Sequence, residues 1–74
     1  MAEHTGFGNI LRSARKAQGI SQEKLSIRSG IDKSNLVEIE GGKINPTYRT
    51  MKLLAAGLGA NLKIDFEFDP EQNK

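Results

Sequence analysis

The chain has 74 residues, of which 36% are hydrophobic and 27% charged, and its formal net charge at pH 7 is +2. This length predicts a single small domain, close to the size at which one core is only marginally stable unless the chain oligomerises. The sequence contains no cysteine, which excludes disulfides and thiolate metal sites and fits a reducing cytoplasm. It also lacks an apolar run of ~18 residues, so we expect neither a membrane span nor a signal peptide.

The charge is unevenly distributed along the chain. Residues 10–52 hold nine basic and four acidic residues, a balance of +5, whereas residues 60–74 hold two basic and four acidic residues, a balance of −2. A positive field on the first part would attract an acidic partner such as a phosphate backbone. Small soluble domains often show charge differences of this size along the chain, so the charge distribution alone does not establish that the partner is acidic.

The first half of the chain predicts two helices. We expect residues 1–6 to be disordered. An apolar stripe with helical spacing runs from Phe7 to Gln18 and closes at Gly19. Ser21 is a good N-cap for a second helix, which ends at Gly30, where a left-handed backbone suits glycine.

A third helix follows at once and completes a recognisable motif. Asp32 is its expected N-cap, Leu36 and Ile39 bury one face, and Gly41 with Gly42 stops it. The opposite face carries Lys33, Ser34, Val37 and Glu38. Two short helices joined by a tight glycine turn form a helix-turn-helix, whose second helix fits the DNA major groove.

A fourth helix is predicted after the loop that ends at Pro46. Thr47 is its expected N-cap, and Gly57 and Gly59 terminate it. Its inward residues are expected to be Tyr48, Met51, Leu54, Ala55 and Leu58.

The hydrophobic period changes from helical to two after Gly59, which predicts a strand over residues 60–68. Its apolar residues are Leu62, Ile64, Phe66 and Phe68. One strand needs a pairing partner, and the same strand of a second copy is the simplest one. Ile10 and Leu53, apolar but off the main stripes of their helices, would extend that dimer interface. The alternatives are scattered surface hydrophobics and a segment folded back on its own helices. Residues 69–74 are expected to be disordered.

The segment from Leu11 to Gly59 resembles the phage repressor and Cro family, also called the xenobiotic-response-element family. The matching pieces are R-x3-GISQ-x2-L, S-x-L-x2-IE-x-GK and NPT-x2-T, which are specific in combination. The resemblance implies an all-α fold of the lambda-repressor type, with four helices, that reads operators as a symmetric dimer. A strand in place of the usual fifth helix looks like the antitoxin subset. Ser26 and Val37 depart from the Ala and the polar residue usual at these positions.

Base recognition is predicted for the outward face of the third helix. Lys33 can donate to guanine, Glu38 can accept from cytosine N4, Val37 can contact a thymine methyl, and Ser34 can serve several bases. A phosphate contact is expected from Gln22, at the start of the second helix. The resemblance implies further phosphate contacts from the loop and the start of the fourth helix. The residues in that second group are Lys43, Asn45, Thr47 and Arg49. The alternative for both the base-contacting and the phosphate-contacting residues is that they are ordinary polar surface residues in contact with water.

Arg15 and Glu40 match an Arg and a Glu of the resembled family. The resemblance implies a partly buried salt bridge between the first and third helices, which orients the recognition helix. An enzyme is not indicated, because the single histidine, His4, lies in the expected N-terminal tail and the acidic residues show no metal-ligand spacing. We expect no cofactor and no metal.

These patterns together predict a sequence-specific regulator of transcription that binds double-stranded DNA. We expect a homodimer that represses from a palindromic operator and is located in the cytoplasm at the nucleoid. The alternative is an antitoxin that neutralises a partner toxin protein and autoregulates its operon. A module that bridges proteins without binding DNA is a third possibility.

Overall fold

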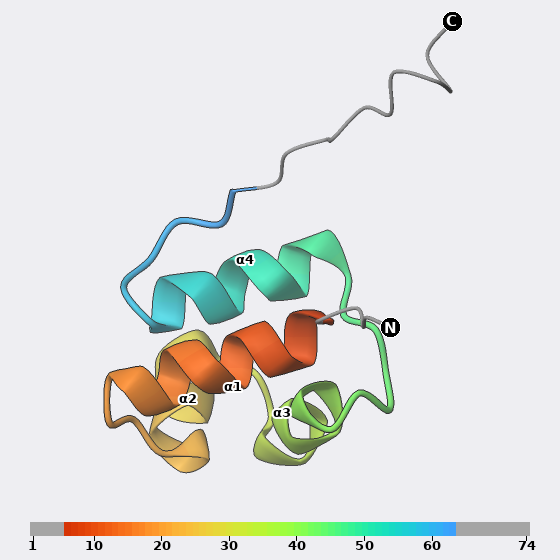
Figure 1. Ribbon diagram of the computed structural model, residues 1–74, viewed down its shortest axis with the longest axis horizontal. Helices are drawn as coiled ribbons and strands as arrows, with labels where there is room; N and C mark the ends of the chain where they lie inside the picture. Colours follow the sequence, from red (N-terminus) through yellow and green to blue (C-terminus); the bar gives the residue numbers. More distant parts are fainter. Residues whose placement is uncertain (1–5, 64–74) are drawn as a thin grey trace, which may run out of the picture.

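The computed structural model describes residues 6–63, which form four α-helices (Figure 1). They are α1 (Phe7–Ala17), α2 (Gln22–Ser29), α3 (Lys33–Glu40) and α4 (Tyr48–Gly57). The predicted all-α class with four helices is therefore confirmed. None of the described helices is long and apolar enough to cross a membrane.

The predicted C-terminal strand falls almost entirely outside the described residues. Residues 60–63 have no regular secondary structure, and residues 64–68 are not described. The segments predicted to be disordered, at the two ends of the chain, also lie outside the described range except for Gly6. Strand pairing between two copies therefore stays a prediction.

Local capping chemistry sets where the helices begin. The Ser21 hydroxyl accepts a hydrogen bond from the Lys24 amide at 3.0 Å, and the Thr47 hydroxyl accepts one from the Thr50 amide at 3.2 Å. Asp32 occupies the N-cap of α3, but its side chain caps no amide. Its carboxylate accepts from the Ser34 hydroxyl at 2.8 Å instead. The predicted N-cap position of Asp32 is therefore confirmed, but its side chain caps no backbone amide, because a neighbouring hydroxyl competes for the carboxylate.

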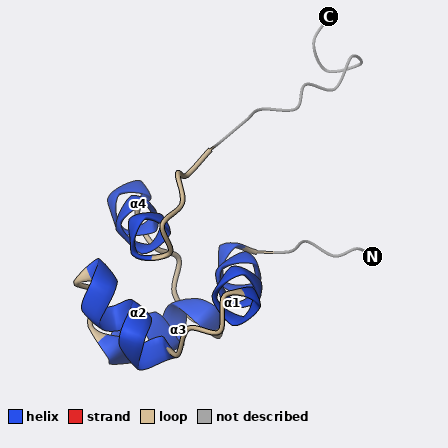
Figure 2. Cartoon of the chain, turned by 90° about the vertical axis from the view of Figure 1, so that its left-hand side faces the viewer, coloured by secondary structure: helices blue, strands red, loops and turns tan. Residues whose placement is uncertain are grey.

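The core lies where the four helices meet. α4 packs on α2 and α1 packs on α3, so that the helix-turn-helix pair α2–α3 has a supporting helix at each end (Figure 2). The buried apolar residues are Leu11, Ile20, Leu25, Leu36, Ile39, Leu54 and Leu58. All four helices and the turn after α1 contribute to this cluster, which fixes how α3 is presented to solvent.

One predicted core residue is on the surface. Tyr48 is 54% exposed, and the Lys52 ammonium lies 5.4 Å from its ring centroid. Burial along α4 fades towards its start, from fully buried Leu54 through partly buried Met51 to Tyr48. The prediction for Tyr48 is wrong because the apolar stripe of α4 continues beyond the part of the helix that the core covers. The Tyr48 ring makes a cation–π contact with Lys52 instead of packing in the core.

Gly30, which ends α2 at φ +77°, allows a first testable prediction. An added Cβ would meet no atom within 4 Å, so replacement would cost only backbone strain. We expect Gly30→Ala to lower the free energy of unfolding by about 1–2 kcal/mol, measured by urea denaturation. Gly30→Asn should lose less, because asparagine tolerates the left-handed conformation better. Equal losses for the two variants would contradict this explanation.

Candidate nucleic-acid interface

The outward side of α3 presents an open, polar surface. Leu36, Ile39 and Glu40 are buried and hold the helix against the core. The four residues predicted to contact bases line one open hollow of about 700 Å³, together with Gly41 and Lys43. The members from α3 are Lys33, Ser34, Val37 and Glu38. The fold therefore places these side chains side by side, as the helical spacing predicts.

The hollow combines several kinds of chemical group. Lys33 and Lys43 supply ammonium donors, and Glu38 supplies a carboxylate acceptor. Val37, which is 43% exposed, adds apolar surface. The Ser34 hydroxyl donates to Asp32, so in this arrangement it would meet a ligand mainly as an acceptor. Such a mixed set of donors, acceptor and apolar surface suits the edges of base pairs in a major groove.

Lys43 and Gly41 were not predicted to belong with the base-contacting residues. From the sequence, Lys43 was predicted to contact a DNA phosphate, and Gly41 was predicted only to end the third helix. Backbone bonds from Gly42 to Ile39 and from Lys43 to Glu38 curl the chain back at the end of α3. This Schellman-type turn brings the Lys43 side chain to the hollow. Two glycines followed by a lysine at a helix end are the sequence signal for it.

Gln22 at the start of α2 is less available than predicted. It is half-buried, and its side-chain amide donates to the Glu40 carboxylate at 3.1 Å. The backbone amides of Gln22 and Glu23 open α2, where a helix offers them no internal acceptor. The predicted phosphate contact therefore depends on the backbone of this turn more than on the Gln22 amide.

The remaining predicted phosphate contacts lie apart from the hollow. Asn45, Thr47 and Arg49 are exposed on the loop before α4 and on its first turn. The Thr47 hydroxyl also donates to the Thr50 hydroxyl at 3.1 Å, in addition to its capping bond. Thr47 therefore shapes the start of α4, whereas Asn45 and Arg49 remain candidates for backbone contacts.

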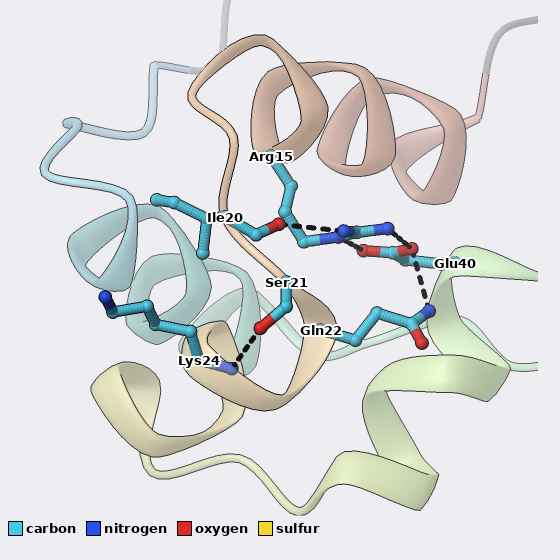
Figure 3. A network of polar contacts seen from close by, with 6 residues as sticks. All are labelled: Arg15, Ile20, Ser21, Gln22, Lys24 and Glu40. Carbon is cyan, nitrogen blue, oxygen red and sulfur yellow. Dashed lines mark hydrogen bonds and ion pairs between the residues drawn. The ribbon is translucent and has the colours of Figure 1, made fainter.

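A buried ion pair supports the interface from behind (Figure 3). Arg15 donates from Nε to Glu40 Oε2 at 2.7 Å and from NH2 to Glu40 Oε1 at 2.9 Å. Its third nitrogen donates to the Ile20 carbonyl at 2.9 Å. Arg15 and Glu40 are 8% and 3% exposed. Because Gln22 binds the same carboxylate, the network joins α1, α2 and the end of α3. The sequence resemblance pointed to the pair but not to Ile20 or Gln22.

The network also predicts how stability depends on pH. Burial would raise the pKa of Glu40, but hydrogen bonds from Arg15 and Gln22 and the charges of Arg15 and Arg12 outweigh it and hold the pKa below the ordinary 4.5. The folded state therefore binds the Glu40 proton more weakly than the unfolded chain does. The contribution of the Glu40 carboxylate to stability is therefore complete above the pKa of Glu40 in the unfolded chain, and it is lost as the pH falls through the lower pKa of Glu40 in the folded state.

We expect urea denaturation to show nearly constant stability from pH 7 to about pH 5.5 and a decline at lower pH. The Glu40→Gln variant should be less stable at pH 7 and should decline less steeply with acid. Parallel declines in the two proteins would assign the acid sensitivity to other carboxylates.

Known proteins resemble the chain in both sequence and fold. Residues 8–64 match the family described as "Helix-turn-helix domain". An uncharacterised HTH-type transcriptional regulator of Archaeoglobus fulgidus is 32% identical, over 84% of this chain and 89% of its own length. The HTH-type transcriptional regulator SlrR of Bacillus subtilis is 39% identical, over 76% of this chain but only 38% of its own length.

Solved structures show the same fold. The restriction-modification controller protein C.AhdI from Aeromonas hydrophila superposes with a TM-score of 0.72 at 38% identity, covering 74% of this chain and 83% of the controller. A mutant of the restriction-modification controller protein C.Esp1396I gives a TM-score of 0.71 at 26% identity, covering 73% of this chain and 70% of its own. The family match spans most of the chain and the resemblance drawn from its motifs is confirmed, so the chain belongs to the helix-turn-helix domain family, of the xenobiotic-response-element type.

Proposed function

We propose that this chain, a DNA-binding transcriptional regulator, binds a palindromic operator as a homodimer and represses transcription from it. The observation that carries the proposal is the open hollow on α3, where donors, an acceptor and apolar surface lie together. The family consists of DNA-binding regulators and is not an enzyme class, so we propose no catalytic activity. The site of action would be the cytoplasm, at the nucleoid.

Surface hydrophobics support the homodimer. Ile10 on α1 is 54% exposed and Leu53 on α4 is 40% exposed. Ile10 and Leu62 also line a groove of about 150 Å³ between α1, α4 and the segment that follows α4. The apolar residues Ile64, Phe66 and Phe68 come next in the sequence and would extend this surface across a two-fold axis. Such a dimer would place its recognition helices about 34 Å apart, one turn of DNA.

Salt-dependent binding tests the DNA-binding part of the proposal. Duplexes selected by the full chain from a random pool should bind more tightly than a random duplex of equal length, and the affinity should fall linearly with the logarithm of salt concentration. Failure to retain any duplex at low salt would remove the proposal and favour a module that bridges proteins.

Light scattering tests the dimer separately. The full chain should have the mass of two copies, and a form that ends at Gly59 should shift towards one. An unchanged mass after truncation would exclude the strand formed by residues 60–68 as the dimer contact.

The similarity to two restriction-modification controller proteins favours a second candidate function. The chain would then control a restriction–modification system, as the names of these two proteins say of them. The antitoxin alternative rests only on the C-terminal pattern of apolar and acidic residues. Neighbouring genes and co-purification with a small toxin protein separate these roles.

A further inference from the structure

We infer that Gly8 is a positioning residue for DNA recognition, because it allows the recognition helix α3 to pack closely against α1 and so fixes the orientation of α3. This inference rests on the proposed binding of DNA by α3. Gly8 is the second residue of α1 and lies outside the hollow that the base-contacting residues line.

The backbones of α1 and α3 touch at this position. A Cβ on Gly8 would overlap the Ile39 carbonyl oxygen and would lie 3.1 Å from the Glu40 carbonyl oxygen. Gly8 does not have a positive φ, so the requirement for glycine here is space and not backbone conformation. Both neighbours are backbone atoms, and they cannot rotate away as a flexible side chain would.

Gly8 belongs to a stripe on α1 that holds the last turn of α3. Leu11 and Arg15 follow it at helical spacing, and both are buried. Leu11 joins the core, and Arg15 binds the Glu40 side chain. The end of α3 is therefore fixed twice, through its backbone by Gly8 and through the Glu40 carboxylate by Arg15. Both views place α1 against α3 (Figures 1 and 2).

The polarity of the two helix ends favours this contact. The first turn of α1 carries a partial positive charge, and the last turn of α3 carries a partial negative charge. Close approach therefore stabilises the pair, and it would weaken if the helices moved apart.

A side chain at Gly8 would tilt the recognition surface. To restore an ordinary van der Waals separation, the start of α1 and the end of α3 must move apart by about 1 Å. The Arg15–Glu40 pair would hold the other side, so we expect α3 to rotate about that pair. Lys33 and Glu38 would then be displaced from the base edges, whose recognition depends on hydrogen-bond geometry.

The test compares Gly8→Ala with Gly57→Ala. Gly57 is a matched control, because it is a packing glycine at the α2–α4 contact, where a Cβ would lie 2.9 Å from Leu25 Cδ1 and 3.2 Å from Ser29 Cβ. Both variants of the full chain would be titrated with a duplex that the unmodified chain selected from a random pool, and with a random duplex. The affinities would be corrected for the folded fraction, measured by circular dichroism.

We expect Gly8→Ala to reduce the ratio of selected to random affinity about tenfold or more, the size of one lost base contact. Gly57→Ala should change this ratio less than about threefold, even where its melting temperature falls as much. An unchanged ratio for Gly8→Ala would overturn the inference, and so would equal reductions in the two variants. Failure of the unmodified chain to bind any duplex would instead overturn the proposed function.

Hydrogen exchange of the unmodified chain keeps the inference testable if Gly8→Ala does not fold. The amides of Asn9 and Ile10, which bond to the Gly6 carbonyl, should open together with the Gly41 and Gly42 amides that close α3. Much easier opening of the α1 turn than of the α3 end would show that α1 does not hold α3, and would overturn the inference.

Discussion

Replacement of Arg15 by alanine is expected to lower the free energy of unfolding by about 3–5 kcal/mol. The variant would leave the Glu40 carboxylate, which is 3% exposed, with only the Gln22 amide as a hydrogen-bond partner. It would also leave the Ile20 carbonyl without its Arg15 donor. A domain of this size has a total stability of roughly 4–11 kcal/mol, so the loss would remove a large share of it and would leave the variant partly unfolded at ambient temperature if the total lies at the low end of that range.

Thermal and urea denaturation check this expectation against Arg12→Ala. Arg12 is one turn earlier on α1 and exposed, so its replacement should change stability by less than about 0.5 kcal/mol. The double variant Arg15→Met with Glu40→Leu should recover most of the loss, because it removes both buried charges together. Equal melting temperatures for Arg15→Ala and Arg12→Ala would contradict a buried ion pair in solution.

Local sequence features predicted most of the fold. The starts of α2 and α4 follow from Ser21 and Thr47, whose hydroxyls cap amides within one turn, and the end of α2 follows from Gly30, which adopts a left-handed backbone. Such interactions need only neighbouring residues, so they can be recognised without knowledge of the tertiary structure. The exposure of Tyr48 was not predictable in this way, because it depends on where the core ends.

The supporting contacts of the site were harder to predict. The helical period brought Lys33, Val37 and Glu38 to one face, as the structure shows. The Arg15–Glu40 pair was implied only by resemblance, and the role of Gly8 was missed, although both contacts support the same helix. Gly8 lies in the first turn of a helix, where no reverse turn requires a glycine, and this was the sequence feature that could have indicated close approach of another backbone. Which backbone approaches it depends on the tertiary packing, and the local pattern does not contain that information.

The period-two pattern of residues 60–68 shows the same limit. Alternation predicts which side chains share a face, but it carries no information about the pairing partner. Whether residues 60–68 pair with a second copy or fold back on the chain's own helices therefore depends on how strongly the segment binds each of these surfaces. Ile10 and Leu53 remain candidates for that interface because they are exposed apolar residues on α1 and α4.

The second large effect is expected for base recognition. Replacing Lys33 and Glu38 together by alanine should weaken binding to the selected duplex by about 2–6 kcal/mol, since each well-placed base contact contributes roughly 1–3 kcal/mol. The change removes one positive and one negative charge, so the net charge of +2 stays the same. Non-specific binding depends mainly on charge and should therefore remain nearly constant. Fluorescence anisotropy on the selected and random duplexes measures both quantities.

A matched variant separates base recognition from a general effect of surface mutation. Glu23→Ala with Arg28→Ala also removes one acid and one base, and both residues are exposed on α2 away from the hollow. It should leave the ratio of selected to random affinity within about threefold of the unmodified chain. A similar loss on both duplexes for the Lys33 and Glu38 variant would mean that these residues contribute only to the electrostatic field. A loss confined to the selected duplex would assign sequence discrimination to α3, because charge, fold and oligomeric state are the same in both measurements.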